Sequence, residues 1–460
     1  MKVLFLSHYF PPEGNAPASR VHALAKRWVA AGHEVQVITG APNAPNGVVY
    51  EGYRNRLCRT EVADGIRVTR VWTFMAANRG KVRRVLNYLS FFVSALLAGL
   101  FVRRPDVVIA TSPQFFCGWA GAWVARLRRL PFILEIRDIW PASIVAVGAM
   151  QRNRLVAFLQ YLERRMYAAA DHIVTVGDCY KDAILQRGVP AEKITVIMNA
   201  VDTDIFRPRQ PDTELKRQLG LNGEFVCAYV GTIGMACGLD VVLRAAERLR
   251  RMQRKDIRFV LVGDGAVRTQ LQAEADRMGL TNVTFTGLQP KARIPAYLSV
   301  ADACLVHLRK NELFEAVMPS KIFEAAGMAK PIIIGVRGFA QRFVLDAGAG
   351  LAVEPENENE LADALVQLAD NPSSRAAYGD GGYRYVTSHY TRDILADRYL
   401  RLIHRIAGQP QAEMLPATAV PQQLATSPGP SRIVPVPRSK RDATQPAAVE
   451  IADTADHQNT

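Results

Sequence analysis

The stretch "FVCAYVGTIGMACGLD", from Phe225 to Asp240, decides the fold class of this chain. It begins with a short apolar run of strand-forming residues, and a glycine-punctuated turn follows that run. A segment with helical spacing then leads to the next apolar run, "IRFVLVG". This order predicts a βαβ unit and therefore a mostly parallel sheet. Ligands bind beyond the carboxyl ends of the strands in such sheets, so the turn at Gly231 is a place to look for a site.

The same alternation extends over most of the sequence in both directions. Before this unit, apolar runs from "KVLFLS" to "ITVIMNA" alternate with helical patterns such as residues 18–31 and 154–170. After it come the runs "NVTFTG", "ACLVHL", "PIIIGV" and "GLAVEP". Between the two series, "NAVDTDIFRPRQPDT" has the Asp, Pro and polar content of a linker. The expected fold class is therefore α/β, with two similar halves that each hold a parallel sheet covered on both faces.

The domain boundaries follow from these segments. A chain of 460 residues exceeds what one core usually supports. We predict an amino-terminal domain over residues 1–205, a carboxyl-terminal domain over 206–388, and one further amphipathic helix over 389–408. Residues 409–460 hold eight of the 26 prolines and have no sustained periodicity, so we expect a disordered tail.

Basic residues are concentrated near the amino terminus. The formal net charge is +14, and up to Arg104 there are fifteen Lys and Arg against five Asp and Glu. Such a surface suits an anionic lipid, a phosphorylated substrate or nucleic acid, or is simply solvated. No RNA-binding or zinc-finger signature is present, so nucleic acid is the least favoured partner. Scattered cysteines, and a first apolar run that ends in Pro-Pro, unlike a signal peptide, favour a cytoplasmic protein.

Residues 85–102, "VLNYLSFFVSALLAGLFV", form an uncharged stretch between two pairs of arginines, Arg83-Arg84 and Arg103-Arg104. A membrane-spanning helix needs about 20 apolar residues, so the length is borderline. The strand "PDVVIATSP" follows at once, and a spanning helix would separate that strand from its sheet. We therefore expect a helix packed on the sheet. Partial exposure and the arginine-rich ends would still allow peripheral contact with anionic headgroups.

Three turns that follow predicted strands carry candidate site residues. The turn "HYFPPEGNAPASR" contains Gly14, where a ligand could approach the backbone. The amides of the turn from Gly231 to Gly234 suit a phosphate, although an ordinary tight loop explains such a turn equally well. The segment "RDIWP" places Arg137 beside Asp138 at the exit of a strand, either as an active-site pair or as a surface ion pair.

A fourth candidate is the start of the stretch "EAVMPSKIFEAAGMAKPIII". Pro319 is tolerated in the first turn of a helix, Ser320 is a natural capping residue, and Lys321 and Glu324 share one helix face. The lysine and free helix amides can bind a diphosphate, while the glutamate can accept hydrogen bonds from sugar hydroxyls. The alternative is a capped helix with a local Lys-Glu pair.

Taken together, these segments resemble the retaining glycosyltransferases of family 4, whose GT-B architecture has two Rossmann-like domains facing a cleft. The resemblance covers Lys2 to about Ala407. It rests on "YFPPEGNAPASR", "GHEVQVITGAPNAPNG", "EIRDIWP", "NAVDTDIF", "GTIGMACGLD", "VGDGA" and "PSKIFEAAGMAKPII". Within the family the chain is most similar to bacterial enzymes that add fucosamine-type sugars to O-antigen or capsule precursors.

The resemblance implies roles for the matched residues. Glu324 would bind the ribose of a nucleotide-sugar donor and Lys321 its diphosphate, and no metal or other cofactor is implied. The donor-binding residues expected on this basis are Gly14, Gly231, Thr232, Gly234, Glu315, Ser320, Lys321 and Glu324. The catalytic residues expected are Arg137 and Asp138, and the acceptor-side residues are Glu13 and Arg20.

The chain departs from the family pattern at three points. A glutamate often found eight residues before the ribose-binding one is replaced by Ala316, and Glu315 lies one residue away. The glycine turn has Thr232 and Cys237 where many members have an arginine and a lysine, so Lys321, or Arg137 and Arg20 reaching across the cleft, must meet more of the diphosphate charge. A histidine often stands where this chain has Arg137.

The function expected from the resemblance is transfer of a sugar to an acceptor in cell-surface polysaccharide biosynthesis. A polyprenyl-diphosphate-linked acceptor suits both the basic first domain and the apolar helix, which predicts an enzyme at the inner face of the membrane. Two alternatives stay open. An epimerase of GT-B architecture would convert a nucleotide sugar without any acceptor, and a non-catalytic membrane-bound scaffold would keep only the fold.

Overall fold

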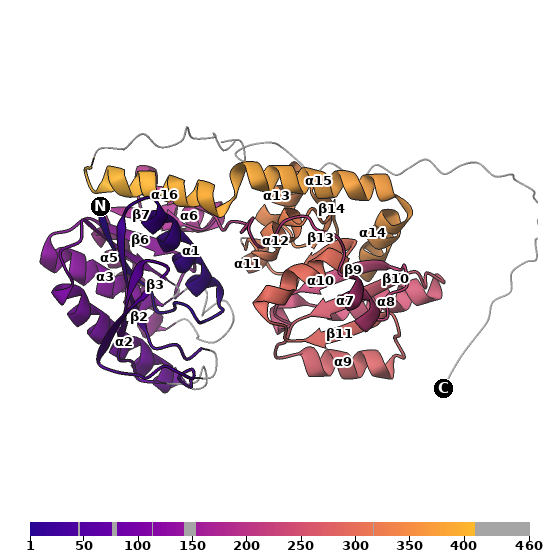
Figure 1. Ribbon diagram of the computed structural model, residues 1–460, viewed down its shortest axis with the longest axis horizontal. Helices are drawn as coiled ribbons and strands as arrows, with labels where there is room; N and C mark the ends of the chain where they lie inside the picture. Colours follow the sequence, from indigo (N-terminus) through magenta and orange to yellow (C-terminus); the bar gives the residue numbers. More distant parts are fainter. Residues whose placement is uncertain (45–46, 76–80, 113, 142–152, 316, 410–460) are drawn as a thin grey trace, which may run out of the picture. The chain divides into compact units, whose positions relative to one another are not determined.

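The apolar runs of the sequence form two separate sheets, as the computed structural model shows (Figure 1). The structure describes residues 1–409 apart from 45–46, 76–80, 113, 142–152 and 316. These residues belong to one compact unit, Met1–Thr418. The tail predicted to be disordered lies, after Gln409, outside the described residues.

The first sheet has eight strands in the order β3-β4-β2-β1-β5-β6-β7-β8. Every neighbouring pair is parallel except β3 and β4. The sequence pattern does not predict β3, because this edge strand carries exposed charged residues. The strands are β1 Lys2–Leu6, β2 Glu34–Gly40, β3 Cys58–Ala63, β4 Ile66–Val71, β5 Val107–Thr111, β6 Phe132–Ile136, β7 His172–Thr175 and β8 Ile194–Val196.

Helices cover both faces of this sheet. Right-handed crossovers place α2, α3 and α5 on one face and α1 on the other, where α16 packs against it. The helices are α1 Ala16–Ala30, α2 Lys81–Phe101, α3 Phe115–Arg128, α5 Arg154–Ala169, α6 Asp178–Leu185 and α16 Arg392–Ile406, with the 3₁₀ turn η1 Ala191–Lys193. Trp28 of α1 donates an indole hydrogen bond to the carbonyl of Ala396 in α16 at 3.0 Å.

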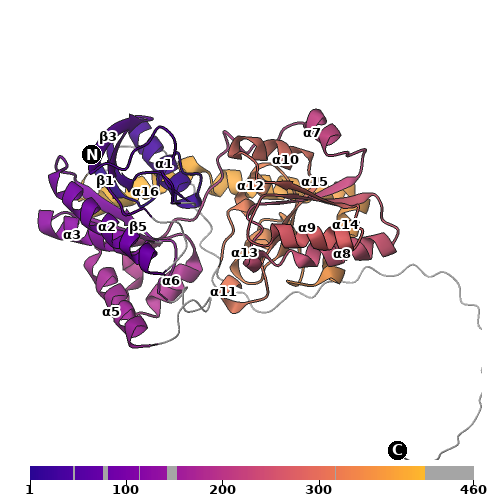
Figure 2. The same cartoon turned by 90° about the horizontal axis from the view of Figure 1, so that it is seen from below.

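The second sheet is parallel throughout, in the order β11-β10-β9-β12-β13-β14. Its strands are β9 Phe225–Val230, β10 Ile257–Val262, β11 Val283–Gly287, β12 Ala303–His307, β13 Ile332–Gly335 and β14 Gly350–Ala352. The helices are α7 Thr213–Gln218, α8 Asp240–Arg251, α9 Arg268–Arg277, α10 Ile294–Val300, α11 Glu312–Glu315, α12 Lys321–Gly327, α13 Phe339–Asp346, α14 Glu358–Asp370 and α15 Pro372–His389, with the 3₁₀ turns η2 Met235–Cys237 and η3 Lys291–Arg293. Figure 2 shows this sheet nearly edge-on, with α8 and α9 on one side of it and α10 on the other.

The strand order of each sheet reverses beside its first strand. The reversal falls between β1 and β5 in the first sheet and between β9 and β12 in the second. At such a switch point the flanking crossovers leave on opposite faces, which opens a crevice at the carboxyl edge. The turns after β1, β9 and β12 are therefore where the fold favours ligand binding.

The apolar stretch at residues 85–102 forms most of α2 and lies on the first sheet. Asn87, Phe91 and Ala95 face inward and are buried. Among the residues that the structure describes, one helical stretch, Arg83–Phe101, is long and apolar enough to cross a membrane by length and composition. The opposite face of the helix is exposed and apolar, with Leu97 at 53% and Phe101 at 87% exposure.

Candidate functional site

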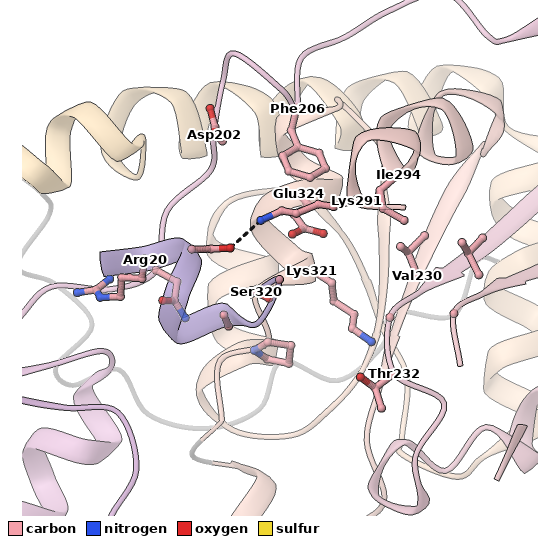
Figure 3. Close-up of a pocket in the computed structure, with 18 of the residues that line it drawn as sticks. Arg20, Asp202, Phe206, Val230, Thr232, Lys291, Ile294, Ser320, Lys321 and Glu324 are labelled. Carbon is pink, nitrogen blue, oxygen red and sulfur yellow. Dashed lines mark hydrogen bonds between the residues drawn. The ribbon is translucent and has the colours of Figure 1, made fainter. Parts of the chain in front are cut away.

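A pocket of about 600 Å³ collects turn residues that follow strands of both sheets (Figure 3). Gly14, after β1, and Arg20, in α1, line it from the first half of the chain. Thr232, Lys321 and Glu324 line it from the second half. Side chains of opposite charge, from segments far apart in sequence, therefore line one cavity.

The side chain of Lys321 crosses the face of Tyr229 to reach the turn after β9. Its Nζ lies 3.7 Å from the centre of the Tyr229 ring, a cation–π contact. In the described chain the ammonium group makes neither an ion pair nor a hydrogen bond, and burial lowers its pKa to about 8. Figure 3 shows the amine pointing toward Thr232. A half-buried cation without an anionic partner suits an anionic ligand.

Glu324 lies one helical turn after Lys321 and faces the same cavity. Burial raises the pKa of its carboxyl, while Lys291, Lys321 and Arg392 act in the opposite direction from nearby. Within the described ranges no hydrogen bond or ion pair engages the Glu324 carboxylate. The alternative of a local Lys-Glu pair is therefore wrong, because the two charges do not contact each other. Both are left available to a ligand.

The start of α12 differs from the expected capped helix. Ser320 is at the N-cap position, but its side chain makes no capping hydrogen bond. Pro319 lies before that position and not in the first turn. The amides of Ile322 and Phe323 donate to the carbonyls of Pro319 and Ser320 at 3.2 and 3.1 Å, so they are not free for a phosphate. The charge of Lys321 is the stronger feature of this helix start.

The turn after β9 needs glycine for a physical reason at its first position. Gly231 has φ +143°, and a Cβ placed there would lie 3.0 Å from Nζ of Lys321. The carbonyl of Thr232 accepts hydrogen bonds from the hydroxyl of Tyr229 at 2.7 Å and from Sγ of Cys237 at 3.2 Å. Gly231, Thr232 and Cys237 line the pocket, whereas Gly234 does not.

Four charged residues in the pocket were not predicted from the sequence: Asp202, Asp264, Lys291 and Arg392. Lys291 follows β11, and its Nζ donates to Oγ of Ser19 at 2.8 Å (Figure 3). Arg392, at the start of α16, forms an ion pair with Asp202. Lys291 could have been found because it too follows a strand, but the pairing of Asp202 with Arg392 joins residues that the sequence keeps far apart.

Two family models match the chain. A glycosyl transferase 4-like domain matches residues 15–200, and a glycosyl transferases group 1 domain matches residues 211–385. This chain belongs to glycosyltransferase family 4.

Individual relatives agree with the family. The protein named colanic acid biosynthesis glycosyl transferase WcaI, from Escherichia coli K12, is 27% identical over 379 residues, which are 80% of this chain and 92% of WcaI. A sucrose-phosphate synthase from Thermosynechococcus elongatus has a TM-score of 0.69 at 18% identity, and 88% of this chain covers 99% of it. Anabaena HepE, solved in complex with UDP and glucose, has a TM-score of 0.64 at 17% identity, with 88% and 99% covered. The predicted GT-B fold is confirmed.

In this glycosyltransferase, Arg20 is held inside the first half of the chain and does not reach out toward a diphosphate. Its Nε forms an ion pair with Glu135 at 3.2 Å, and its two Nη atoms donate to the carbonyls of Met198 and Ile197 at 2.7 and 2.8 Å. Only 8% of the Arg20 side chain is exposed. Arg20 lines the pocket, but its hydrogen-bond donors are therefore already used within the fold.

Two of the expected glutamates lie away from the pocket. Glu13 is buried, and its carboxylate accepts hydrogen bonds from the amides of Phe10, Asn43 and Ala44 at 3.3, 3.0 and 3.0 Å, which ties the turn after β1 to the turn after β2. Glu315 is exposed at the end of α11 and does not line the pocket. Ala316, the position of the missing family glutamate, lies outside the described residues.

The expected catalytic pair follows β6 but does not line this pocket. Asp138 lines a separate cavity of about 10 Å³ beside Phe115 and Trp140. Nε and Nη1 of Arg137 have no hydrogen-bond partner in the described part of the chain, and burial lowers the pKa of this guanidinium to about 10. The predicted position of both residues beside the reacting sugar stays a prediction.

Within the residues that the structure describes, no group of three or more His, Cys, Asp or Glu side chains could hold a metal ion. The charges available to a diphosphate in the pocket are those of Lys321 and its neighbouring cations.

Proposed function

We propose that this glycosyltransferase moves a sugar from a nucleotide-sugar donor to a lipid-diphosphate-linked acceptor, with retention of the anomeric configuration, in cell-surface polysaccharide biosynthesis. The observation that carries the proposal is the pair Lys321 and Glu324. These two half-buried, opposite charges face one pocket without contacting each other. A nucleotide sugar has a suitable partner for each charge. Its anionic diphosphate suits Lys321, and its hydroxyl groups can donate hydrogen bonds to Glu324.

The proposed donor lies with its diphosphate between Lys321 and the turn after β9, and its ribose hydroxyls donate to Glu324. In the reaction, the bond from the anomeric carbon to the diphosphate oxygen breaks, and the acceptor oxygen bonds to that carbon on the same face. The acceptor proton passes to the departing phosphate. Negative charge grows on the leaving group, so the ammonium of Lys321 stabilises the transition state more than the ground state. The UDP complex of HepE supports a nucleoside diphosphate as ligand.

The test uses purified protein, labelled nucleotide sugars and a membrane lipid extract. Transfer of label to a lipid-extractable product is expected with at least one donor, and that product should disappear when the extract is omitted. If every donor leaves the protein inactive, the proposed transfer is wrong. If an altered nucleotide sugar forms without any acceptor, the epimerase is the better hypothesis.

A lipid-linked acceptor is supported by the outer face of α2. Its exposed apolar residues recur every three or four positions, so they form one stripe along the helix: Leu86, Leu89, Val93, Leu97 and Phe101. At the start of the helix, Tyr88 packs edge-on against His8, which follows β1. The stripe therefore begins beside the carboxyl edge of the first sheet, where an acceptor is expected to bind.

The neighbouring helices continue this surface. Trp123 and Leu127 of α3 and Leu155 and Phe158 of α5 are also exposed, at 42 to 56%. The three helices carry eight Lys and Arg but one acid, Glu163, which is buried against Arg187. An apolar surface with an arginine rim suits the headgroup region of an anionic bilayer. We therefore propose that the enzyme lies at the inner face of the membrane, with this surface against the lipid.

Vesicle sedimentation tests this location. The wild-type protein should bind vesicles that contain phosphatidylglycerol more strongly than pure phosphatidylcholine vesicles. Replacing Leu89, Val93 and Leu97 together with serine should abolish most of that binding. A control with serine at Leu57, Val62 and Leu345, which are on average more exposed but lie elsewhere, should bind as the wild type does. Equal loss in both triple variants, or no binding by the wild type, would contradict the proposal.

A further inference from the structure

The turn after β9 is held from behind by residues at the end of β12. Three successive carbonyl groups of the turn each accept a hydrogen bond from this strand end. Nε of Arg309 donates to Met235 and its backbone amide donates to Ala236, both at 2.9 Å, and Nδ1 of His307 donates to Cys237 at 2.7 Å. In a trans peptide the carbonyl and the following amide point in opposite directions. The amides of Ala236 and Gly238 are therefore turned away from β12, whereas that of Cys237 donates to the carbonyl of Gly234 within the turn at 3.0 Å.

Both ring nitrogens of His307 are committed to backbone groups of different loops. Nε2 accepts a hydrogen bond from the amide of Glu356 at 2.9 Å, so the ring proton is on Nδ1 and the imidazole is neutral. The residue is 1% exposed. A Cβ added to Gly238 would lie 3.1 Å from Cε1 of the ring, and one added to Gly335 would lie 2.3 Å from Cδ2. Close backbone on two sides fixes the ring in place.

Arg309 extends the same connection through its guanidinium. Nη1 donates to Glu356 at 2.6 Å and Nη2 donates to Asp240, the first residue of α8, at 2.9 Å. The other carboxylate oxygen of Glu356 accepts from the amide of Lys310 at 2.9 Å. The turn, the start of α8 and the loop after β14 are thus joined through one strand end. We call His307 and Arg309 the brace.

We infer that the brace positions the turn at residues 231–238 for the donor diphosphate, so His307 and Arg309 are positioning residues that act through the backbone of the turn. The inference rests on the proposed donor site. The turn from Gly231 to Gly238 contains no lysine or arginine that could meet the charge of a diphosphate. Oriented amides and Lys321 must then supply more of the stabilisation, and amides are effective only when they are held in place before the ligand arrives.

Three substitutions of His307 separate the two hydrogen bonds of its ring. His307→Phe keeps an aromatic ring and removes both bonds. His307→Asn keeps an N–H donor near the position of Nδ1, for Cys237, and His307→Gln keeps an acceptor near the position of Nε2, for Glu356. Arg309→Met removes the bond to Met235 together with the ion pairs to Glu356 and Asp240, from a half-exposed side chain. Arg337→Met is its control, because Arg337 is similarly exposed but pairs with Glu354 and not with the turn.

Calorimetric titration with UDP, GDP, UMP and GMP measures the effect on the phosphate part of the ligand. For whichever diphosphate the wild type binds, we expect His307→Phe, His307→Gln and Arg309→Met to weaken binding about ten-fold, from the loss of one hydrogen bond in the turn. His307→Asn should recover most of that loss. Binding of the matching monophosphate should change less than the diphosphate, and Arg337→Met should match the wild type.

The outcomes separate this inference from the proposed function. If the wild type binds neither diphosphate, both the donor site and the inference fail. If it binds one, and folded His307 and Arg309 variants bind equally well, only the inference fails. Equal losses in His307→Asn and His307→Gln would likewise overturn it, because a general packing defect does not distinguish the two nitrogens. Should His307→Phe not fold, the Arg309→Met comparison decides the question alone.

Discussion

Two pairs of opposite charges at the same pocket differ in how they are used, although only Arg20, Lys321 and Glu324 of their members line it. In the first half of the chain, Arg20 pairs with the buried Glu135, and its remaining donors engage backbone carbonyls. In the second half, Lys321 and Glu324 are one helical turn apart and make no ion pair. Burying a charge costs free energy unless a partner compensates, so the first pair is satisfied by the fold and the second is not. Burial alone does not distinguish the two pairs. The lack of a charged partner for Lys321 and Glu324 in the described part of the chain is what indicates a binding site.

The largest effect is expected for Lys321. The substitution Lys321→Met keeps the apolar stem over Tyr229 and removes the charge that faces the diphosphate. We expect kcat/KM for the donor to fall about 100-fold or more, the usual size for the loss of one group that stabilises a leaving group. Initial rates with the best donor measure this.

A matched control is Lys330→Met. Lys330 is another lysine whose pKa burial lowers, but it does not line the pocket. It should retain near wild-type kcat/KM when the protein is folded. Equal losses of kcat/KM in the two variants would mean that replacing any such lysine lowers the activity, so the unpaired charge of Lys321 would have no special role.

A second large effect is expected on stability and not on donor binding. Arg20→Met leaves Glu135 buried without its cation, which should cost about 3 to 5 kcal/mol in the free energy of unfolding. Urea denaturation measures this cost. The double variant Arg20→Met with Glu135→Gln should recover part of it, because no buried charge is left unpaired.

Donor KM then tells which use of Arg20 is correct. For the folded fraction of Arg20→Met, KM should stay within about three-fold of the wild type, since the arginine's donors already have partners. A stable variant with a strongly raised donor KM would contradict the comparison and show that Arg20 contributes to donor binding.

Glu324 should show an intermediate effect. Glu324→Gln keeps the shape of the side chain but replaces a charged hydrogen-bond acceptor with a neutral one. Donor KM should rise about ten-fold, because hydrogen bonds to charged groups are roughly twice as strong as neutral ones. Glu315→Gln is the control, since Glu315 is exposed outside the pocket, and its KM should not change.

The contrast between the two halves also explains what the sequence could predict. Gly231, Lys321 and Glu324 were predictable because each lies at or shortly after the end of a strand or the start of a helix, where local pattern is strong. The partner of Arg20 lies 115 residues away, and no local pattern carries that pairing. Long-range hydrogen bonds depend on strand order, so the sequence predicted that Gly231, Lys321 and Glu324 lie together but not how Arg20 is paired.

A smaller effect is expected from pH. Burial lowers the pKa of Lys321 to about 8, and the amine is charged below that value. Donor kcat/KM should therefore fall as pH rises through about 8, by about four-fold between pH 7 and pH 8.5 if only the charged form binds. Lys321→Arg should move this decline to higher pH, because guanidinium stays charged. An alkaline decline that is unchanged in Lys321→Arg would assign the titration to another group.

The smallest effect is expected from metal removal. If Lys321 and the turn meet the diphosphate charge, dialysis against EDTA should change the transfer rate less than about two-fold. A divalent ion could still enter with the nucleotide, so the decisive comparison is between the wild type and Lys321→Met, each with EDTA and with added Mg²⁺. Rescue of Lys321→Met by Mg²⁺ would mean that the ion and the ammonium group both neutralise the charge of the donor diphosphate. Loss of wild-type activity in EDTA, restored by Mg²⁺, would show that the open lysine does not suffice, and the contrast between the two halves would then lose its functional meaning.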